Sequence, residues 1–237
     1  MAKTITAVGN AQVDTAQQKF GTGSALLDGT GDYLTTPWHT DFDVAAGDFT
    51  IEFWFRWNAS GGYQWLLSGR NGANDDYQYI GLGFSNGGTV LDYFASSNGS
   101  SWDLLLGDTG ALDRGSITVT TGVWHHFALT RSGNNWKGFI DGVLDWSKTQ
   151  SGTVIAADSV IAIGVHTAGG SSFNGWIDEF RFTKGVARWT AAFTPPTSAY
   201  TCADQYTKLL IHCNGADAST TFTDDTTICF IPQIIII

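Results

Sequence analysis

Turn signals built on glycine recur along this chain at a spacing of roughly ten residues. Asn71-Gly72, Asn98-Gly99 and Asp141-Gly142 each separate two short segments that are rich in β-branched and aromatic residues. Asparagine, aspartate and glycine tolerate the left-handed backbone of tight turns, so each dipeptide marks a reversal of the chain. No segment longer than a turn or two has helical periodicity. The pattern predicts an all-β protein, a sandwich or a barrel of short strands.

Composition indicates that the chain can bury a large core. Of its 237 residues, 43% are hydrophobic and 14% are charged, which is typical of a globular protein and not of a disordered one. Because all-β sandwiches of this length often fold as one unit, we expect one large domain. The net charge of −10 repels phosphate backbones and anionic membranes, which argues against nucleic acid as a partner and against membrane insertion.

The two ends of the chain carry no secretion or membrane signal. No basic and apolar leader precedes the first strand-like segment, so synthesis in a cytoplasm is expected. The closing run Ile234 to Ile237 is too short to span a bilayer. The chain has three cysteines, Cys202, Cys213 and Cys229. An odd number of cysteines, together with the lack of a visible leader, argues against a disulfide framework. A bridge between Cys202 and Cys213 is the alternative.

The segment Phe49 to Trp57 alternates as an amphipathic strand requires, because side chains two residues apart share a face. Its apolar face consists of Ile51, Phe53, Phe55 and Trp57. Glu52, Trp54 and Arg56 fall on the opposite face. The apolar face is predicted to meet the core, and the opposite face is predicted to be solvated.

A second strand, predicted over residues 174–183, places a charged group among aromatic rings. Strict alternation puts Trp176, Asp178, Phe180 and Phe182 on one face. The opposite face then holds Ile177, Glu179, Arg181 and Thr183. The aromatic face is the predicted core face. Because a bare carboxylate is costly to bury, Asp178 is expected to have hydrogen-bond donors or a cation as partner.

Several segments together resemble the concanavalin A-like, laminin-G-like jelly-roll superfamily. The resemblance is carried by Gly23 to Gly29 with Asp32 to Leu34, by Asp48 to Trp54, and by Trp124 to Gly142. The segment Phe173 to Pro196 resembles the variant that is common in bacteriophage virion proteins. The resemblance covers about the first 200 residues. It implies a two-sheet antiparallel jelly-roll sandwich over residues 1–200, and it says little about function because one sandwich hosts many functions.

Residues 201–237 form an extension that carries one further strand. The segment Tyr206 to Asp217 resembles the opening strand of the same phage domains, so the order of the strands is permuted. An edge left unpaired is an aggregation hazard. The strand is therefore expected to fold back into its own sandwich, or to add to a neighbouring copy and link copies into a homo-oligomer. A frayed tail without a partner is the third alternative.

Three aspartates are candidate ligands of a calcium ion. Asp28 and Asp32 flank a glycine turn, and Asp178 needs compensation. Hard carboxylate and carbonyl oxygens suit Ca²⁺ better than a transition metal. The resemblance supports calcium by analogy, since members of that superfamily often hold one. The alternative is that Asp28 and Asp32 cap their own turns and that Asp178 accepts backbone N–H bonds.

Catalysis is not expected. Retaining glycosidases of the resembled group place two carboxylates about 5 Å apart on one face of a strand. Asp178 and Glu179 are adjacent and fall on opposite faces, and the strand of Glu52 carries one carboxylate. The chain is therefore predicted not to be an enzyme.

A surface for a carbohydrate or a protein is the remaining candidate site. Aromatic rings with a few polar groups suit both kinds of partner. The predicted contact residues are Glu52, Trp54, Arg56, Trp65 and Tyr77. The alternative is a second, partly covered sheet face.

These observations lead to one functional expectation with two alternatives. The expected protein is a non-enzymatic virion module that decorates a phage particle or touches a host surface glycan, with avidity arising from many copies. Its partners would be copies of itself, other virion proteins or that glycan. The first alternative is a stand-alone carbohydrate-binding lectin domain, and the distant one is a glycan hydrolase.

Overall fold

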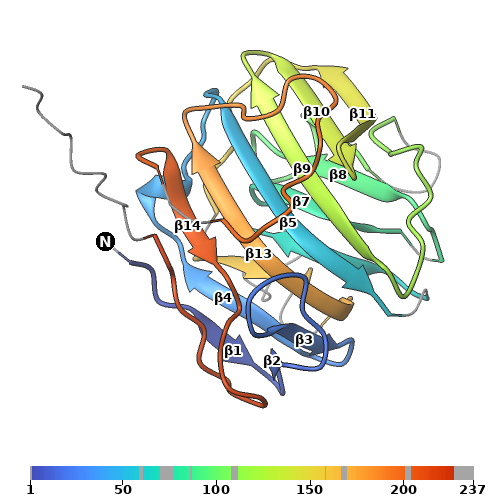
Figure 1. Ribbon diagram of the computed structural model, residues 1–237. Helices are drawn as coiled ribbons and strands as arrows, with labels where there is room; N and C mark the ends of the chain where they lie inside the picture. The colour runs from blue at the N-terminus through green and yellow to red at the C-terminus, as the bar shows by residue number, and fades with distance from the viewer. Residues whose placement is uncertain are drawn as a thin grey trace, which may run out of the picture.

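Two antiparallel β-sheets pack face to face in the computed structural model, which confirms the predicted all-β sandwich (Figure 1). The structure describes residues 2–58, 61–69, 77–85, 87–107, 112–157, 159–166, 170–200 and 204–226. Within these ranges the helical content is a single 3₁₀ turn, η1 (Thr40–Phe42). No helix in the described ranges is long and apolar enough to cross a membrane.

One sheet has six strands. In spatial order they are β1 (Thr6–Val8), β4 (Tyr33–Pro37), β12 (Val160–Ile163), β6 (Gln64–Ser68), β7 (Ile80–Phe84) and β8 (Leu91–Ala95). All of its pairs are antiparallel. The glycine turns predicted at Asn71-Gly72 and Asn86-Gly87 fall partly outside the described residues.

The other sheet has eight strands. In spatial order seven of them are β11 (Val143–Thr149), β10 (Asn135–Ile140), β9 (Trp124–Ser132), β5 (Phe49–Trp57), β13 (Asn174–Lys184), β3 (Ser24–Asp28) and β2 (Gln12–Asp14). The eighth, β14 (Thr207–Ile211), pairs with β13. β9, β10 and β11 form a meander, and its second turn is the one predicted at Asp141-Gly142.

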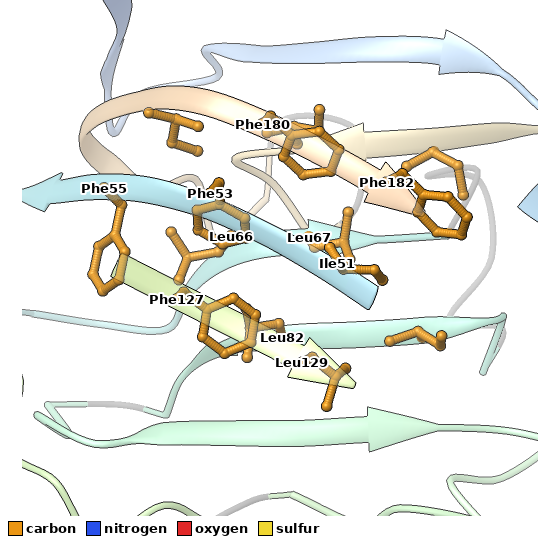
Figure 2. Close-up of a cluster of buried hydrophobic side chains, with 14 of the residues drawn as sticks. Ile51, Phe53, Phe55, Leu66, Leu67, Leu82, Phe127, Leu129, Phe180 and Phe182 are labelled. Atoms are coloured by element: carbon orange, nitrogen blue, oxygen red, sulfur yellow. The ribbon is translucent and has the colours of Figure 1, made fainter. Parts of the chain in front are cut away.

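The core lies between the sheets and combines aliphatic side chains with many aromatic rings. Ile51, Phe53 and Phe55 of β5 are fully buried, which confirms the predicted core face of this strand. The ring of Phe53 lies 5.1 Å from that of Phe127 and 5.7 Å from that of Phe180 (Figure 2). Burial of each such side chain contributes about 1.5 to 3 kcal/mol.

A β-bulge in β13 contradicts the strict alternation predicted for residues 174–183. The register with β5 shifts between Asp178 and Arg181, and Glu179 has a φ of 53°. The extra residue reverses the parity of the strand. Ile177 therefore faces the core before the bulge, whereas Phe180 faces it after the bulge.

The bulge also moves Asp178 away from its predicted place in the core. Asp178 lies opposite Trp54, and Trp176 lies opposite Arg56, so both project from the outer face of the sheet. The prediction that Trp176 and Asp178 share the core face with Phe180 is therefore wrong. The physical reason is that one inserted residue moves every side chain that follows it in the strand to the opposite face of the sheet.

The C-terminal strand folds back onto its own chain. β3 pairs with β13 over residues 174–177, and β14 pairs with it over residues 180–183, so two strands share one edge end to end (Figure 1). Of the arrangements expected for this strand, the structure has the intramolecular one. Cys213, beyond β14, is a buried free thiol, whereas Cys202 and Cys229 lie outside the described residues.

Residues 213–226, which follow β14, are bonded to the N-terminal part of the chain. The amide of Val13 donates to the carbonyl of Ser219 at 2.8 Å. The amide of Thr22 donates to Asn214 Oδ1 at 2.6 Å, and the amide of Lys3 donates to Asp224 Oδ2 at 2.7 Å. The residues that follow β14 are therefore held against the N-terminal part of the chain by these hydrogen bonds.

Replacing Leu209 by alanine tests whether β14 belongs to the folded core. Leu209 is fully buried, so Leu209→Ala is expected to lower the free energy of unfolding by about 2 to 5 kcal/mol. Lys208→Ala, on the same strand, is the control and is expected to change it by less than about 0.5 kcal/mol. Urea unfolding followed by tryptophan fluorescence measures both. Equal effects of the two changes would contradict the placement of β14.

Candidate functional site

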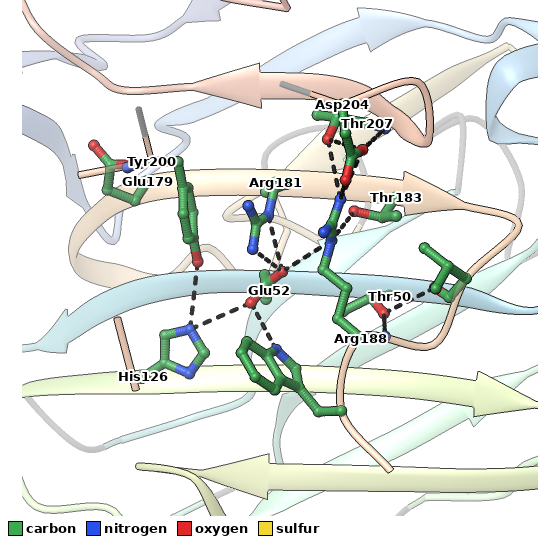
Figure 3. Close-up of polar contacts among 12 residues, drawn as sticks. Thr50, Glu52, His126, Glu179, Arg181, Thr183, Arg188, Tyr200, Asp204 and Thr207 are labelled. Carbon is green, nitrogen blue, oxygen red and sulfur yellow. Dashed lines mark hydrogen bonds and ion pairs between the residues drawn. The ribbon is translucent and has the colours of Figure 1, made fainter. Parts of the chain in front are cut away.

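Glu52 is the centre of a buried polar network on the outer face of the eight-stranded sheet. Its Oε1 accepts hydrogen bonds from Arg181 Nε at 2.9 Å and from Arg181 Nη2 at 2.7 Å. Its Oε2 accepts one from Trp189 Nε1 at 2.9 Å. Figure 3 shows these partners converging on the carboxylate, which is fully buried. A buried anion of this kind is tolerated because a guanidinium and an indole N–H satisfy it.

The segment 185–200, named the strap here, covers this face. The hydroxyl of Thr130 on β9 donates to the carbonyl of Trp189, and the amide of Phe193 donates to the carbonyl of Gly142. The rings of Trp189 and Phe193 stack with centroids 3.9 Å apart. The prediction of a solvated face at Glu52, Trp54 and Arg56 is therefore wrong: Glu52 and Trp54 are buried, and Arg56 is half-buried.

His126 completes the network as a neutral base. Its Nε2 lies 3.6 Å from Glu52 Oε2 and 3.4 Å from the Tyr200 hydroxyl. Burial lowers the pKa of His126 to about 4, although Glu52 opposes that shift. The Arg181 guanidinium lies 3.7 Å from the centroid of the Tyr200 ring. The positive charge that compensates Glu52 therefore comes from Arg181 and Arg188 and not from His126.

Trp54 and Arg56 are each engaged within the chain. The Lys19 ammonium lies 3.8 Å from the centroid of the Trp54 ring. The Arg56 guanidinium lies 4.9 Å from the centroid of the Trp176 ring, and Arg56 Nε donates to the carbonyl of Gly122 at 3.0 Å. These cation–π pairs cover the aromatic faces that a ligand would need.

The bulge brings two buried carboxylates together with three segments of the chain. Asp178 accepts hydrogen bonds from the amides of Lys19 and Phe20. Glu179 accepts one from the amide of Tyr200 at 2.9 Å and contacts His212 Nδ1 at 2.8 Å. The bulge therefore anchors the loop before β3, the strap and the residues after β14.

Burial raises the pKa of Asp178 to about 7, while the amides of Phe20 and Lys19 act to lower it and Glu179 acts to raise it. The hydrogen bond to Glu179 raises the pKa of His212.

The three candidate calcium ligands are not brought together as one cluster. Asp32 accepts hydrogen bonds from the amides of Asn10 and Asp28, and Asp28 accepts one from the amide of Thr30. Asp178 accepts three backbone N–H bonds, the third from Glu179. Among the described residues no group of three or more His, Cys, Asp or Glu is placed to hold a metal ion. Calcium binding stays a prediction.

Trp65 and Tyr77 lie on the other sheet, away from Glu52, Trp54 and Arg56. Both line a hollow of about 380 Å³, which we name the aromatic hollow. Its lining residues are Tyr63, Trp65, Tyr77, Phe94, Trp102, Leu106, Gly107, His166 and Ser171. Trp65 and Phe94 come from β6 and β8 and stand outside the core cluster, so the hollow opens on the outer face of the six-stranded sheet.

Two glycines of β7 make room for the floor of the hollow. A Cβ at Gly81 would collide with the Trp65 ring, and a Cβ at Gly83 would lie 2.7 Å from the carbonyl oxygen of Gln64. Because β7 has no side chain there, the Trp65 ring crosses it and stacks on Phe94 with centroids 4.7 Å apart. The Trp65 ring can therefore form the floor because β7 carries no side chain at positions 81 and 83.

The walls of the hollow are also aromatic. The ring of Trp102 lies 5.3 Å from that of Phe94 and 5.4 Å from that of Tyr77. The ring of His166 lies 4.0 Å from that of Trp65. Tyr63 and Tyr77 are 45% and 36% exposed and stand at the rim. The arrangement offers ring faces for stacking and hydroxyl groups for hydrogen bonds.

Sequence reasoning found Trp65 and Tyr77 and missed Phe94, Trp102 and His166. The alternating glycines at 81 and 83 are the signal that could have found the floor, since paired small residues on one strand face leave room for a large neighbour. Trp102 stands shortly after the Asn98-Gly99 turn. Its approach to Tyr77 depends on how that turn folds, which the sequence does not specify.

Fold and site together define a two-sheet, lectin-like sandwich with an aromatic hollow on one outer face. The model of the concanavalin A-like lectin/glucanases superfamily matches residues 28–190, which is more than half of the chain. The chain therefore belongs to this superfamily, and the predicted resemblance to it is confirmed. No curated protein sequence matches the chain.

Solved structures show the same fold at low sequence identity. Domain 4 of AbnA, a GH43 extracellular arabinanase from Geobacillus stearothermophilus in complex with arabinotriose, is 19% identical over 80% of this chain and 85% of that chain, with a TM-score of 0.55. A proposed carbohydrate-binding protein from Bacteroides ovatus ATCC 8483 is 14% identical over 95% and 56%, with a TM-score of 0.60.

The binding domain of Paraclostridial Mosquitocidal Protein 1 is 14% identical over 81% of this chain and 45% of that chain, with a TM-score of 0.57. The match therefore spans about half of the length of these last two structures.

The ionisation of His126 is a direct test of the buried network. With a pKa of about 4, His126 stays neutral at pH 5, where an ordinary histidine, with a pKa near 6.5, is protonated. As pH falls, the unfolded chain therefore binds a proton at this histidine at a higher pH than the folded chain does. The contribution of His126 lowers the free energy of unfolding as pH falls from 6.5 towards 4. A ¹H–¹⁵N NMR titration of the imidazole rings measures it. A His126 ring that is protonated at pH 6 would contradict the burial.

Proposed function

We propose that the protein is a non-enzymatic glycan-binding module of a bacteriophage particle, with the aromatic hollow as its binding site. The observation that carries the proposal is the row formed by Tyr77, Trp102, Trp65 and Phe94, whose neighbouring ring centroids lie 4.7 to 6.2 Å apart. Trp65 and Phe94 are buried and form the floor, so the apolar face of a sugar ring would stack on Trp102 and Tyr77. The hydroxyls of Tyr63 and Tyr77 at the rim would bond its hydroxyl groups. A hollow of about 380 Å³ suits a short saccharide.

The fold supports the binding part of this proposal. The domain of AbnA that shares the fold is in complex with arabinotriose, and the related protein from Bacteroides ovatus is described as carbohydrate-binding. The hollow has no carboxylate among its described lining residues, so acid–base hydrolysis of a glycoside has no support there. The buried carboxylates Glu52, Asp178 and Glu179 lie on the other sheet and are engaged in structural bonds.

The virion part of the proposal rests on the sequence of residues 173–196, which resembles phage domains. Many copies on one particle would turn a weak site into strong attachment, because linked sites raise the effective concentration. Assembly through strand addition is not part of the proposal, since the strand that would be donated already pairs with β13 of its own chain. The runner-up is a lectin domain with the same site and no place on a virion.

Removing the Trp102 ring tests the site. Trp102→Ala is expected to lower binding to a glycan array at least tenfold, because the ring supplies the wall on which a sugar stacks. Tyr206→Ala removes an exposed ring far from the hollow and is the control, with binding unchanged. Gly81→Ala, which displaces Trp65, is expected to act like Trp102→Ala.

Three outcomes would overturn the proposal. Equal signals from Trp102→Ala and the unaltered protein would remove the hollow as the site. No signal from the unaltered protein on any glycan would remove the binding function. Release of reducing sugar from a glycan would overturn the non-enzymatic part.

A further inference from the structure

The outer face of the meander β9, β10 and β11 carries a grid of hydrogen-bonding side chains. The backbone register places Lys137 directly between Thr130 and Ser147. It places Asn135 directly between Ser132 and Thr149 in the neighbouring row. Partners in adjacent strands lie on the same face, about 4.8 Å apart. Six polar side chains from three strands therefore share one surface.

This grid is hollowed. A hollow of about 320 Å³ is lined by Thr130, Ser132, Asn135, Lys137 and Thr190. A second hollow, of about 220 Å³, shares Asn135 and Lys137 with the first and extends over β11. Thr190 belongs to the strap. The carbonyl oxygen of Thr190 accepts a hydrogen bond from Lys137 Nζ at 2.5 Å. The two hollows adjoin at Asn135 and Lys137 and together form a groove along the grid, with the strap on one side of it.

The chemistry of the groove differs from that of the aromatic hollow. Four hydroxyl groups, one amide and one ammonium project from the six grid positions, and none of the six is a carboxylate. Asp48 accepts a hydrogen bond from the amide of Gly133 at the β9–β10 turn, and Lys148, which also lines the second hollow, is ion-paired with Asp113. Lys137 Nζ bonds the carbonyl oxygen of Thr190, and within the described part of the chain it forms no ion pair.

We propose that this groove, which we name the polar groove, binds an acidic saccharide through Lys137 and the surrounding hydroxyl and amide groups. A carboxylate on the ligand accepts charge-assisted hydrogen bonds from the ammonium, which has N–H groups besides the one given to Thr190. Asn135, Ser147 and Thr149 are exposed, and Thr149 donates its hydroxyl to Asn135 Oδ1 at 3.1 Å. The ligand's hydroxyl groups then pair with the amide N–H groups of Asn135, the hydroxyl of Ser147 and the oxygen of Thr149. An acidic peptide would offer the charge but too few hydroxyl groups for the two rows.

The polar groove is independent of the aromatic hollow. It lies on the outer face of the eight-stranded sheet, whereas the hollow lies on the outer face of the six-stranded one. One module would thus contact a neutral sugar by stacking and an acidic sugar by ionic hydrogen bonds. The proposal holds whether or not the aromatic hollow binds a glycan.

Isothermal titration calorimetry of the full chain with α-1,4-linked trigalacturonate tests the polar groove, with maltotriose as the neutral comparison. Trigalacturonate is expected to bind, and any binding of maltotriose is expected not to depend on Lys137. Lys137→Gln is expected to lower the affinity at least tenfold. Lys208→Gln removes the same charge at β14, where the ammonium bonds the carbonyl of Gln205, and is the matched control with unchanged affinity. Trp102→Ala is expected to leave trigalacturonate binding unchanged.

Each contrary result overturns the assignment. Absence of trigalacturonate binding at millimolar concentration removes the site. An equal loss in Lys137→Gln and Lys208→Gln would mean that net charge alone governs binding. Loss in Trp102→Ala would place the acidic saccharide in the aromatic hollow. Circular dichroism confirms that the variants fold, and the substituted lysines lie on the surface, where such changes are tolerated.

Discussion

The bulge at Glu179 is the constraint on which the arrangement of the sandwich depends. A positive φ at a non-glycine residue costs about 1 to 2 kcal/mol, which the bonds around the bulge offset. Without the extra residue, β13 would keep one parity, and either Ile177 or Phe180 would leave the core. With it, both halves of the strand bury their apolar side chains. The carboxylates of Asp178 and Glu179 then hold the loop before β3, the strap and the residues after β14 on the outer face.

The two outer faces of the sandwich differ as a consequence. The strap lies over Glu52 on the eight-stranded sheet, so the central part of that face is a structural interface made of ion pairs and stacked rings. On the six-stranded sheet the alternating glycines of β7 leave a depression whose rim residues, Tyr63 and Tyr77, are exposed, whereas Trp65 on its floor is 5% exposed and as buried as Trp54. The two proposed binding sites therefore lie at the aromatic hollow and at the polar groove beside Thr190 of the strap.

Much of this architecture follows from the sequence, because it depends on short-range periodicity. The turn at Asp141-Gly142 and the apolar side of β5 were predictable from two-residue alternation and from turn chemistry. The bulge was not, since nothing in the letters of residues 174–183 marks an inserted residue. The burial of Glu52 and Trp54 was missed for a similar reason, because their covering residues are distant in the sequence. Trp189 of the strap bonds Glu52 across more than 130 residues, and Lys19 lies over the Trp54 ring. Trp65 and Tyr77 were predictable as aromatic residues near turns, but their meeting with Trp102 is a tertiary contact.

The unequal exposure of the two faces is the central claim, and hydroxyl-radical footprinting of the ligand-free chain measures it most directly. Side chains at the rim of the aromatic hollow should be oxidised rapidly, Tyr63 and Tyr77 above all, because about two fifths of each is exposed. Trp54, which is 6% exposed beneath Lys19, should be protected until the protein unfolds. Oxidation of Trp54 as fast as that of Tyr63 would contradict the account, because the outer face of the eight-stranded sheet would then be open to solvent.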